Sequence, residues 1–126
     1  MFLFGDTLIR IKNAKLAGID ALEVSYSNLI ANLVEILKKT GFISDYKVFK
    51  DGNIKKINIT IDSSDLSLIN IKLISKPGRR MYITSDQVKR RKRANGFYLI
   101  STPKGLMLDS EAIKIKQGGE VLCRIW

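Results

Sequence analysis

The segment around which this chain is organised is Gly96-Phe97-Tyr98-Leu99-Ile100-Ser101-Thr102-Pro103-Lys104-Gly105. Its apolar run, Phe97 to Ile100, is rich in aromatic and β-branched residues, which favours a β-strand. The next five residues supply two hydroxyl groups, a proline, a lysine and a glycine, which is the chemistry of a turn. We therefore expect a strand that presents hydroxyl groups and one cation at a loop tip. Such a surface suits a phosphate-rich partner.

A block of five cations, Lys89-Arg90-Arg91-Lys92-Arg93, precedes this strand. Three interpretations are open: a solvated charged loop, a patch of the nuclear-import kind, and a clamp for phosphates. The neighbouring aromatic strand and hydroxyl loop favour the clamp. In that interpretation the residues in contact with nucleic acid are Lys89, Arg90, Arg91 and Arg93.

Charge is unevenly distributed over the 126 residues. The formal net charge is +10 with a pI near 9.9, which favours a polyanionic partner, nucleic acid before an acidic membrane surface. Residues 1–75 carry 10 Lys and Arg against 8 Asp and Glu, whereas residues 76–126 carry 12 against 4. The excess therefore belongs mainly to the second part of the chain.

The residue types that are absent or rare in this chain exclude some kinds of functional site. The chain has no histidine, which removes histidine bases and imidazole zinc ligands. Its one cysteine, Cys123, excludes an intramolecular disulfide, and its apolar neighbours indicate a buried thiol. No apolar run approaches the roughly 18 residues of a membrane helix, and the N-terminus does not resemble a secretion signal. We expect a soluble intracellular protein with no metal or cofactor.

The first part of the chain predicts two helices on a small sheet. Helical periodicity covers Met1 to Leu16, and a second helix is expected between an N-cap at Ser27 and a C-terminal stop at Gly41. Strands are expected at 21–25, 42–50 and 54–61, the last two joined through Asp51-Gly52-Asn53. On the first helix Asp6, Arg10 and Asn13 form a polar stripe. By itself this stripe indicates a solvated face with an Asp6–Arg10 pair.

The second part predicts a mainly β unit with one short helix. Strands are expected at 68–74, 81–83, 97–100 and 120–126, and a helix at 109–116 capped by Asp109. Lys76-Pro77-Gly78-Arg79-Arg80 fits a type II turn whose two arginines either solubilise the turn or contact nucleic acid. Tyr82, Phe97 and Tyr98 either stack on bases or pack in the core, the second above all for Phe97. The fold class is therefore α+β, with an N-terminal domain at 1–65 and a C-terminal domain at 66–126.

Separated motifs occur in order along the whole chain: Asp6 to Ala14, Ile36-Leu37, Gly41-Phe42-Ile43, Ile74 to Arg80, Ser101 to Gly105, Gly118 to Cys123, and Trp126. In this order they resemble the family of small-subunit ribosomal protein eight, of the bacterial and organellar type. The resemblance implies a primary rRNA-binding protein that attaches early to the central domain of small-subunit rRNA, beside other small-subunit proteins. It also implies, in bacteria, translational repression of its own operon. The ribosome would be a cytoplasmic one or that of an organelle.

The resemblance also implies which residues contact RNA. By position, the loop would enter the minor groove of an rRNA helix through Ser101, Thr102, Pro103, Lys104 and Gly105. The neighbouring contacts would come from Gly118, Gly119 and Glu120, supported by Arg79, Arg80 and Tyr82. A second RNA surface would be touched by Arg10, Lys12 and Asn13, which replaces the solvated-face interpretation of the first helix.

One position departs from the family, which usually has serine where Pro103 stands. Proline lacks both the amide donor and the hydroxyl, so one contact would be lost while the loop becomes stiffer. Two other functions are weighed against the resemblance. A free-standing nucleic-acid-binding regulator would bind DNA comparably well, and a hydrolase would need Lys104 to activate Ser101, which a three-residue spacing in a turn supports only weakly. We therefore expect a protein that is not an enzyme and has no small-molecule substrate.

Overall fold

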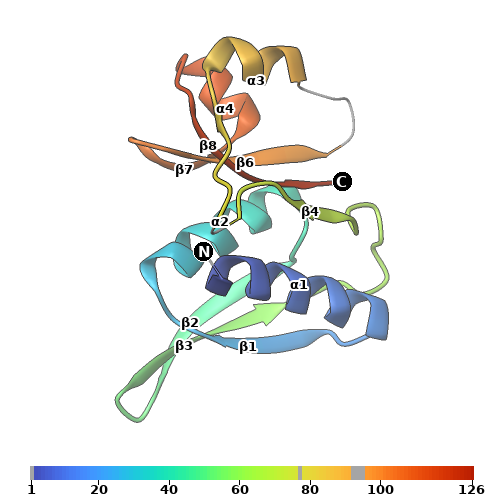
Figure 1. Cartoon of the computed structure of the whole chain (residues 1–126). Helices are drawn as coiled ribbons and strands as arrows, with labels where there is room; N and C mark the ends of the chain where they lie inside the picture. The colour runs from blue at the N-terminus through green and yellow to red at the C-terminus, as the bar shows by residue number, and fades with distance from the viewer. Residues whose placement is uncertain (1, 77, 92–95) are drawn as a thin grey trace. The chain divides into compact units, whose positions relative to one another are not determined.

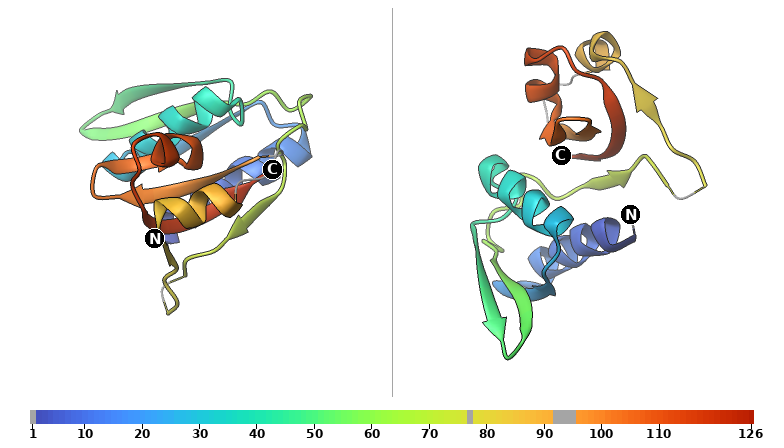
Figure 2. Two further views of the ribbon diagram at one scale, coloured as in Figure 1. Left: turned by 90° about the horizontal axis from the view of Figure 1, so that it is seen from above. Right: turned by 90° about the vertical axis from the view of Figure 1, so that its left-hand side faces the viewer.

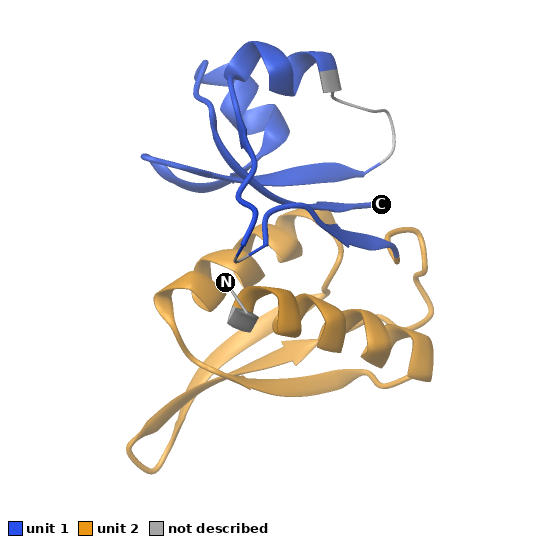
Figure 3. Cartoon of the chain, viewed as in Figure 1, with its two compact units in different colours: residues 1, 70–126 blue, residues 2–69 orange. Residues whose placement is uncertain are grey.

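The structure is a computed structural model that describes residues 2–76, 78–91 and 96–126 (Figure 1). The chain divides into two compact units (Figure 3). The first unit along the chain is Phe2–Ile69, drawn in orange, and the second is Asn70–Trp126, drawn in blue. The expected α+β class is confirmed, because helices and a small sheet form the first unit and a mostly β arrangement forms the second.

The first unit contains the elements α1 (Phe2–Ala17), β1 (Ala21–Ser25), α2 (Asn28–Thr40), β2 (Asp45–Asp51) and β3 (Ile54–Thr60). Its strands form an antiparallel sheet in the order β1-β3-β2, and both helices cover one face of that sheet (Figures 1 and 2). Alternation in β3 explains the packing, since Ile57 and Ile59 are buried while Asn58 and Thr60 are exposed.

The caps of α2 form as the sequence predicts. Ser27 accepts a hydrogen bond from the N–H of Ile30 at 3.1 Å, and Gly41 ends the helix with a φ of 85°. Strand β2, however, begins at Asp45 and not at residue 42. Phe42 and Ile43 are buried in the turn after α2, where their N–H groups donate to the carbonyl of Leu37, so neither is available for the sheet.

Lys15 is a buried cation that the sequence analysis did not single out. Its ammonium lies 4.4 Å from the centre of the Phe42 ring and donates to the carbonyl of Leu68 at 3.2 Å. Burial lowers the pKa of this lysine, and the nearby Asp65 and Asp62 partly offset that effect. The side chain therefore fastens α1 to the segment that follows β3.

The second unit contains β4 (Ile71–Leu73), β5 (Tyr82–Ile83), α3 (Ser85–Arg91), β6 (Phe97–Thr102), β7 (Gly105–Leu108), α4 (Asp109–Lys114) and β8 (Gly119–Ile125). Its sheet has the order β4-β8-β6-β7, and β5 also pairs with β8. Helices α3 and α4 lie on one face of this sheet (Figures 1 and 2). There Val88 of α3 and Ala112 of α4 pack into a core with Ile100 and Val121.

Several element boundaries in the second unit differ from the expectations. Strand β4 has three residues because it pairs only with Cys123–Ile125 of β8. Helix α3 and strand β7 were not expected at all. Helix α4 is shorter than expected, and Asp109 does not cap it: the N-cap is Leu108, and the Asp109 carboxylate accepts from the N–H of Ser110 at 2.8 Å. The predicted type II turn depends on Pro77, which lies outside the described residues.

The structure also describes the burial of Cys123 and the length of the helices. Cys123 is fully buried on β8, as predicted, and burial raises the pKa of its thiol far above the ordinary value. In the described part of the chain, none of the helices has the length and apolar character needed to cross a membrane.

Candidate nucleic-acid interface

The loop singled out in the sequence is the tip of the β6–β7 hairpin. Thr102 pairs with Gly105 across a two-residue turn, and the Gly105 φ of 117° favours glycine at this position. The Thr102 hydroxyl donates to the carbonyl of Gly105 at 2.9 Å and accepts from the N–H of Lys104 at 3.1 Å. Thr102 therefore holds the turn from within, while Ser101, Pro103 and Lys104 are exposed.

Glu120 lies beside this tip because β8 runs between β5 and β6. It pairs with Tyr82 on one side and with Ser101 on the other. One carboxylate oxygen is 3.4 Å from Nη1 of Arg80. The other, Oε2, is buried and has no hydrogen-bond partner among the described residues. An unsatisfied buried acceptor costs free energy in the isolated protein, and Oε2 could accept a hydrogen bond from a bound partner only after the side chain turned outward.

The two glycines before Glu120 allow the backbones to approach closely. A Cβ on Gly119 would lie 2.2 Å from the carbonyl oxygen of Ser101, and one on Gly118 would lie 2.4 Å from that of Ile83. No side chain fits at either distance. Their position in the structure accounts for glycine without any contact to nucleic acid, since they bring β8 against both neighbouring strands.

The arginines and the tyrosine expected to support the tip come from the segment before α3. Arg79 is exposed, and its backbone forms a two-way bridge with Lys76. Tyr82 is 70% exposed, an unusual value for an aromatic side chain in a strand. Through Glu120, the structure brings Arg80, Tyr82 and Ser101 to one end of the sheet.

The basic block begins inside α3 and is not wholly a loop. Val88 packs in the core, which leaves Lys89 and Arg90 exposed on the outer part of the helix. The side chain of Arg91 and the whole of residues 92–95, including Arg93, lie outside the described part. Of the residues in the expected phosphate clamp, the structure therefore describes the side chains of Lys89 and Arg90.

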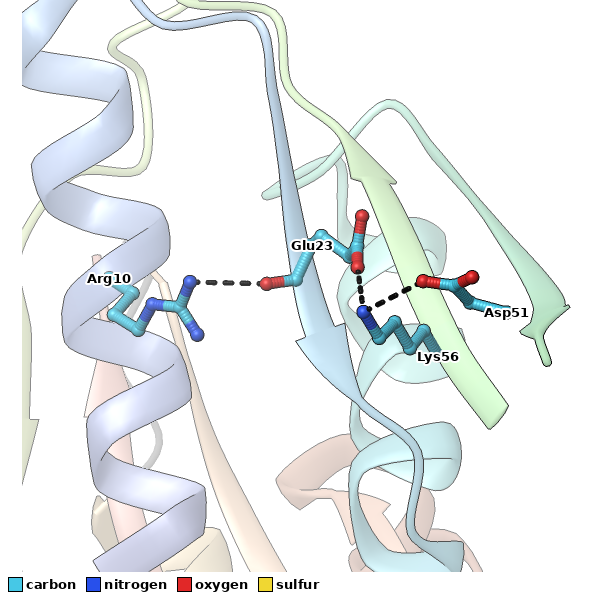
Figure 4. Close-up of polar contacts among 4 residues, drawn as sticks. All are labelled: Arg10, Glu23, Asp51 and Lys56. Atoms are coloured by element: carbon cyan, nitrogen blue, oxygen red, sulfur yellow. Dashed lines mark hydrogen bonds and ion pairs between the residues drawn. The ribbon is translucent and has the colours of Figure 1, made fainter. Parts of the chain in front are cut away.

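The expected contacts on α1 lie in the first unit, separate from the hairpin tip. Arg10 donates from Nη2 to the carbonyl of Glu23 at 3.1 Å (Figure 4). The expected Asp6–Arg10 pair is wrong: the arginine reaches across to β1 and not along its own helix. Only one of the guanidinium's five donors is used in this bond. Lys12 is half-buried and Asn13 is exposed.

The described residues were also compared with the requirements of a metal site. In the ranges that the structure covers, nowhere do three His, Cys, Asp or Glu side chains meet in a way that could hold a metal ion. The surface offers exposed cations and the Ser101 hydroxyl, beside the Glu120 carboxylate. This arrangement can bind a polyanion that also carries hydrogen-bond donors.

A comparison with protein families identifies relatives of this chain. The model of the family described as ribosomal protein S8 matches residues 3–126. The chain belongs to the ribosomal protein S8 family. It is similar to the small ribosomal subunit proteins uS8 of Nautilia profundicola, at 40% identity over 98% of this chain and 97% of the relative, and of Campylobacter hominis, at 41% over the same shares. The uS8 protein of Geobacter sulfurreducens is 40% identical over 96% of this chain and 94% of its own.

Membership of this family confirms the resemblance seen in the motifs. It makes the chain a ribosomal protein of the small subunit, and not an enzyme. The serine–lysine hydrolase considered from the sequence is thereby set aside.

Within the S8 family, the unusual Pro103 has a simple place in this structure. It occupies the second position of the four-residue turn Thr102 to Gly105. Proline is favoured there, and the N–H that it lacks has no partner in such a turn. Proline therefore stiffens the tip without removing a hydrogen bond within the chain.

Proposed function

We propose that this chain is a primary rRNA-binding protein that attaches to the central domain of small-subunit rRNA through the β6–β7 tip. The observation that carries the proposal is the turn held by Thr102, which exposes Ser101 and Lys104 beside the Glu120 carboxylate. A carboxylate in a surface otherwise suited to phosphate is repelled by a polyanion. Its presence is favourable when the partner brings a hydroxyl donor to it.

RNA supplies that donor. An A-form helix displays 2′-hydroxyl groups in a wide, shallow minor groove, where small polar side chains can reach them. Ser101 can both donate and accept there, and Glu120 can accept. Lys104, Arg79 and Arg80 neutralise phosphates and fix the register of binding. The rigid turn presents these groups with little loss of conformational entropy.

The other residues named in the sequence analysis add contacts to the same partner. Arg10, Lys12 and Asn13 form a second RNA contact on α1, and Lys89 to Arg93 form the phosphate clamp. Binding through this many cations falls steeply with salt, because counterions are released. Early attachment would let the chain order the central domain for neighbouring ribosomal proteins.

Two further roles belong to this proposal. The chain represses translation of its own operon by binding an mRNA element that mimics the rRNA site. It resides in the small subunit of a cytoplasmic or an organellar ribosome. Density-gradient fractionation of a lysate tests the second role, and a reporter fused to the operon leader tests the first.

The deciding experiment measures affinity for a central-domain rRNA transcript by filter binding at fixed salt. Ser101→Ala is expected to weaken binding about tenfold, the loss of about 1–2 kcal/mol that follows from one hydrogen bond. Ser110→Ala, an exposed serine on α4 in the same unit, is the matched control and should bind within twofold of the unmodified chain.

A DNA competitor separates this function from its alternative, a free-standing nucleic-acid-binding regulator. A DNA duplex of the same sequence lacks the 2′-hydroxyl groups and should compete at least a hundredfold less well. Equal competition by DNA, or unchanged affinity of Ser101→Ala, would remove the hairpin tip from the RNA site.

A further inference from the structure

A second cationic surface lies at the opposite end of the C-terminal sheet from the hairpin tip. Lys72 on β4 pairs with Arg124 on β8, and Arg124 pairs with Tyr98 on β6. The three side chains therefore form one row across one face of the sheet. On β6, Tyr98 lies three residues before Ser101, which places this row about 10 Å along the strand from the exposed serine of the tip.

Lys72 and Arg124 place two like charges directly opposite each other. Residues directly opposite each other in an antiparallel pair lie close together, and like charges in that arrangement repel. The same face holds a groove of about 420 Å³, lined by four cations, Lys72, Lys76, Arg79 and Arg124, together with Tyr98. No Asp or Glu is among the described residues that line it. An anion in the groove would relieve this repulsion.

The groove also has an ordered recognition element. The Arg124 guanidinium lies 4.5 Å from the centre of the Trp126 ring and 5.9 Å from that of Tyr98. Stacking against aromatic rings orients the planar guanidinium, and this group matches the geometry of a phosphate with two parallel hydrogen bonds. An acidic protein segment would not use the aromatic surface beside it as a nucleotide does.

We propose that this groove binds the sugar-phosphate backbone of an RNA strand, as an extension of the hairpin-tip surface with which it shares Arg79. The proposal rests on the RNA-binding function proposed above and adds Lys72, Lys76 and Arg124 to the residues that carry it. A strand that crosses the groove would place phosphates over the cations and a base or ribose against Tyr98.

The test uses the full chain and the same central-domain rRNA transcript. A double variant, Lys72→Gln with Lys76→Gln, removes two exposed groove cations, and Lys47→Gln with Lys50→Gln removes two exposed cations of β2 as the matched control. The slope of log K against log salt should become shallower by about 1.5–2 for the groove variant and remain unchanged for the control. At a fixed salt concentration the groove variant should bind about tenfold more weakly.

Thermal unfolding supplies an independent readout. Because Lys72 is opposed by Arg124, the groove variant should unfold at the same temperature as the unmodified chain or higher. A purely structural role for these lysines predicts a lower unfolding temperature and an unchanged salt slope, which would overturn the proposal. Loss of affinity that appears only when other ribosomal proteins are present, with unchanged binding to RNA alone, would also overturn it.

The outcomes separate the two proposals. If Ser101→Ala weakens binding and the groove variant does not, the tip function stands and the groove inference fails. If the unmodified chain does not bind the transcript, both fail.

Discussion

The two units of this chain use charged residues differently. Residues 1–69 carry nine Lys and Arg against eight Asp and Glu, and residues 70–126 carry 13 against four. In the first unit Lys56 lies between Glu23 at 2.9 Å and Asp51 at 3.3 Å (Figure 4), and Lys38 lies 2.9 Å from Asp45. In the second unit Arg80 lies 3.4 Å from Glu120. Charges thus stabilise the first unit internally, whereas those of the second are suited to an external partner.

The largest expected effect on stability comes from a substitution at Gly119, where β8 packs closely against β6. Gly119→Ala should lower the free energy of unfolding by about 3 kcal/mol, because β8 must move away from β6 to accommodate the new Cβ. Denaturant unfolding measures this, with Gly78→Ala as the control in open space. A loss below 1 kcal/mol would show that the two strands separate easily.

Thr102→Ala should have the next largest effect. It removes the hydroxyl that bonds both Gly105 and Lys104, which should cost about 1–2 kcal/mol of stability and about tenfold in RNA affinity. Thr102→Ser keeps the hydroxyl and should restore most of both quantities. Lost affinity in Thr102→Ala without lost stability would indicate that this hydroxyl contacts RNA directly.

Glu120→Gln should change stability and binding in opposite directions. Removing the negative charge of a carboxylate that has an unsatisfied buried oxygen should raise the free energy of unfolding by about 0.5–1 kcal/mol, despite the loss of the long contact with Arg80. Affinity for the rRNA transcript should fall about fivefold, because a charged acceptor bonds a hydroxyl more strongly than a neutral one. If both quantities fall, Glu120 has a structural role in the second unit.

The smallest effect tests the internal charge pairs of the first unit. The Lys38 ammonium, with the backbone N–H of Tyr46, holds the pKa of Asp45 below its usual value of 3.8. A carboxyl whose pKa is lower in the folded state contributes stability above its unfolded pKa, and this contribution is lost as the pH falls through the lowered value. Asp45→Asn should therefore unfold at a slightly lower temperature than the unmodified chain at pH 7, and the two should converge at strongly acidic pH. A difference between Asp45→Asn and the unmodified chain that stays constant with pH would exclude the ion pair as its cause.

Local sequence patterns predicted the elements that depend only on neighbouring residues. The cap at Ser27, the stop at Gly41 and the alternation of Ile57 and Ile59 are all confirmed. Helix α3 also begins with a local sequence pattern, which the sequence analysis overlooked because it considered only the charge of the basic block. Thr84 and Gln87 form reciprocal hydrogen bonds of 3.0 and 3.3 Å between side chain and backbone, which is a capping box.

Other features depend on residues that are distant in sequence. Lys15 is buried because Phe42 and Leu68 surround it, and neither is near it in the chain. At the hairpin tip, the residue types indicated a polar turn but not which hydroxyl would face inward. The pairing of Thr102 with Gly105 directs the threonine into the turn and leaves the serine exposed. The groove around Arg124 likewise exists only once β4 pairs with β8.

The solitary thiol of Cys123 has a practical consequence. It sits on β8, the strand that pairs with β4, β5 and β6, and solvent does not reach it in the closed fold. An alkylating reagent can modify it only during moments when that strand comes loose, so the rate of labelling counts those openings. Bound RNA that holds the sheet closed should slow the labelling, so the labelling rate of Cys123 reports on assembly with RNA.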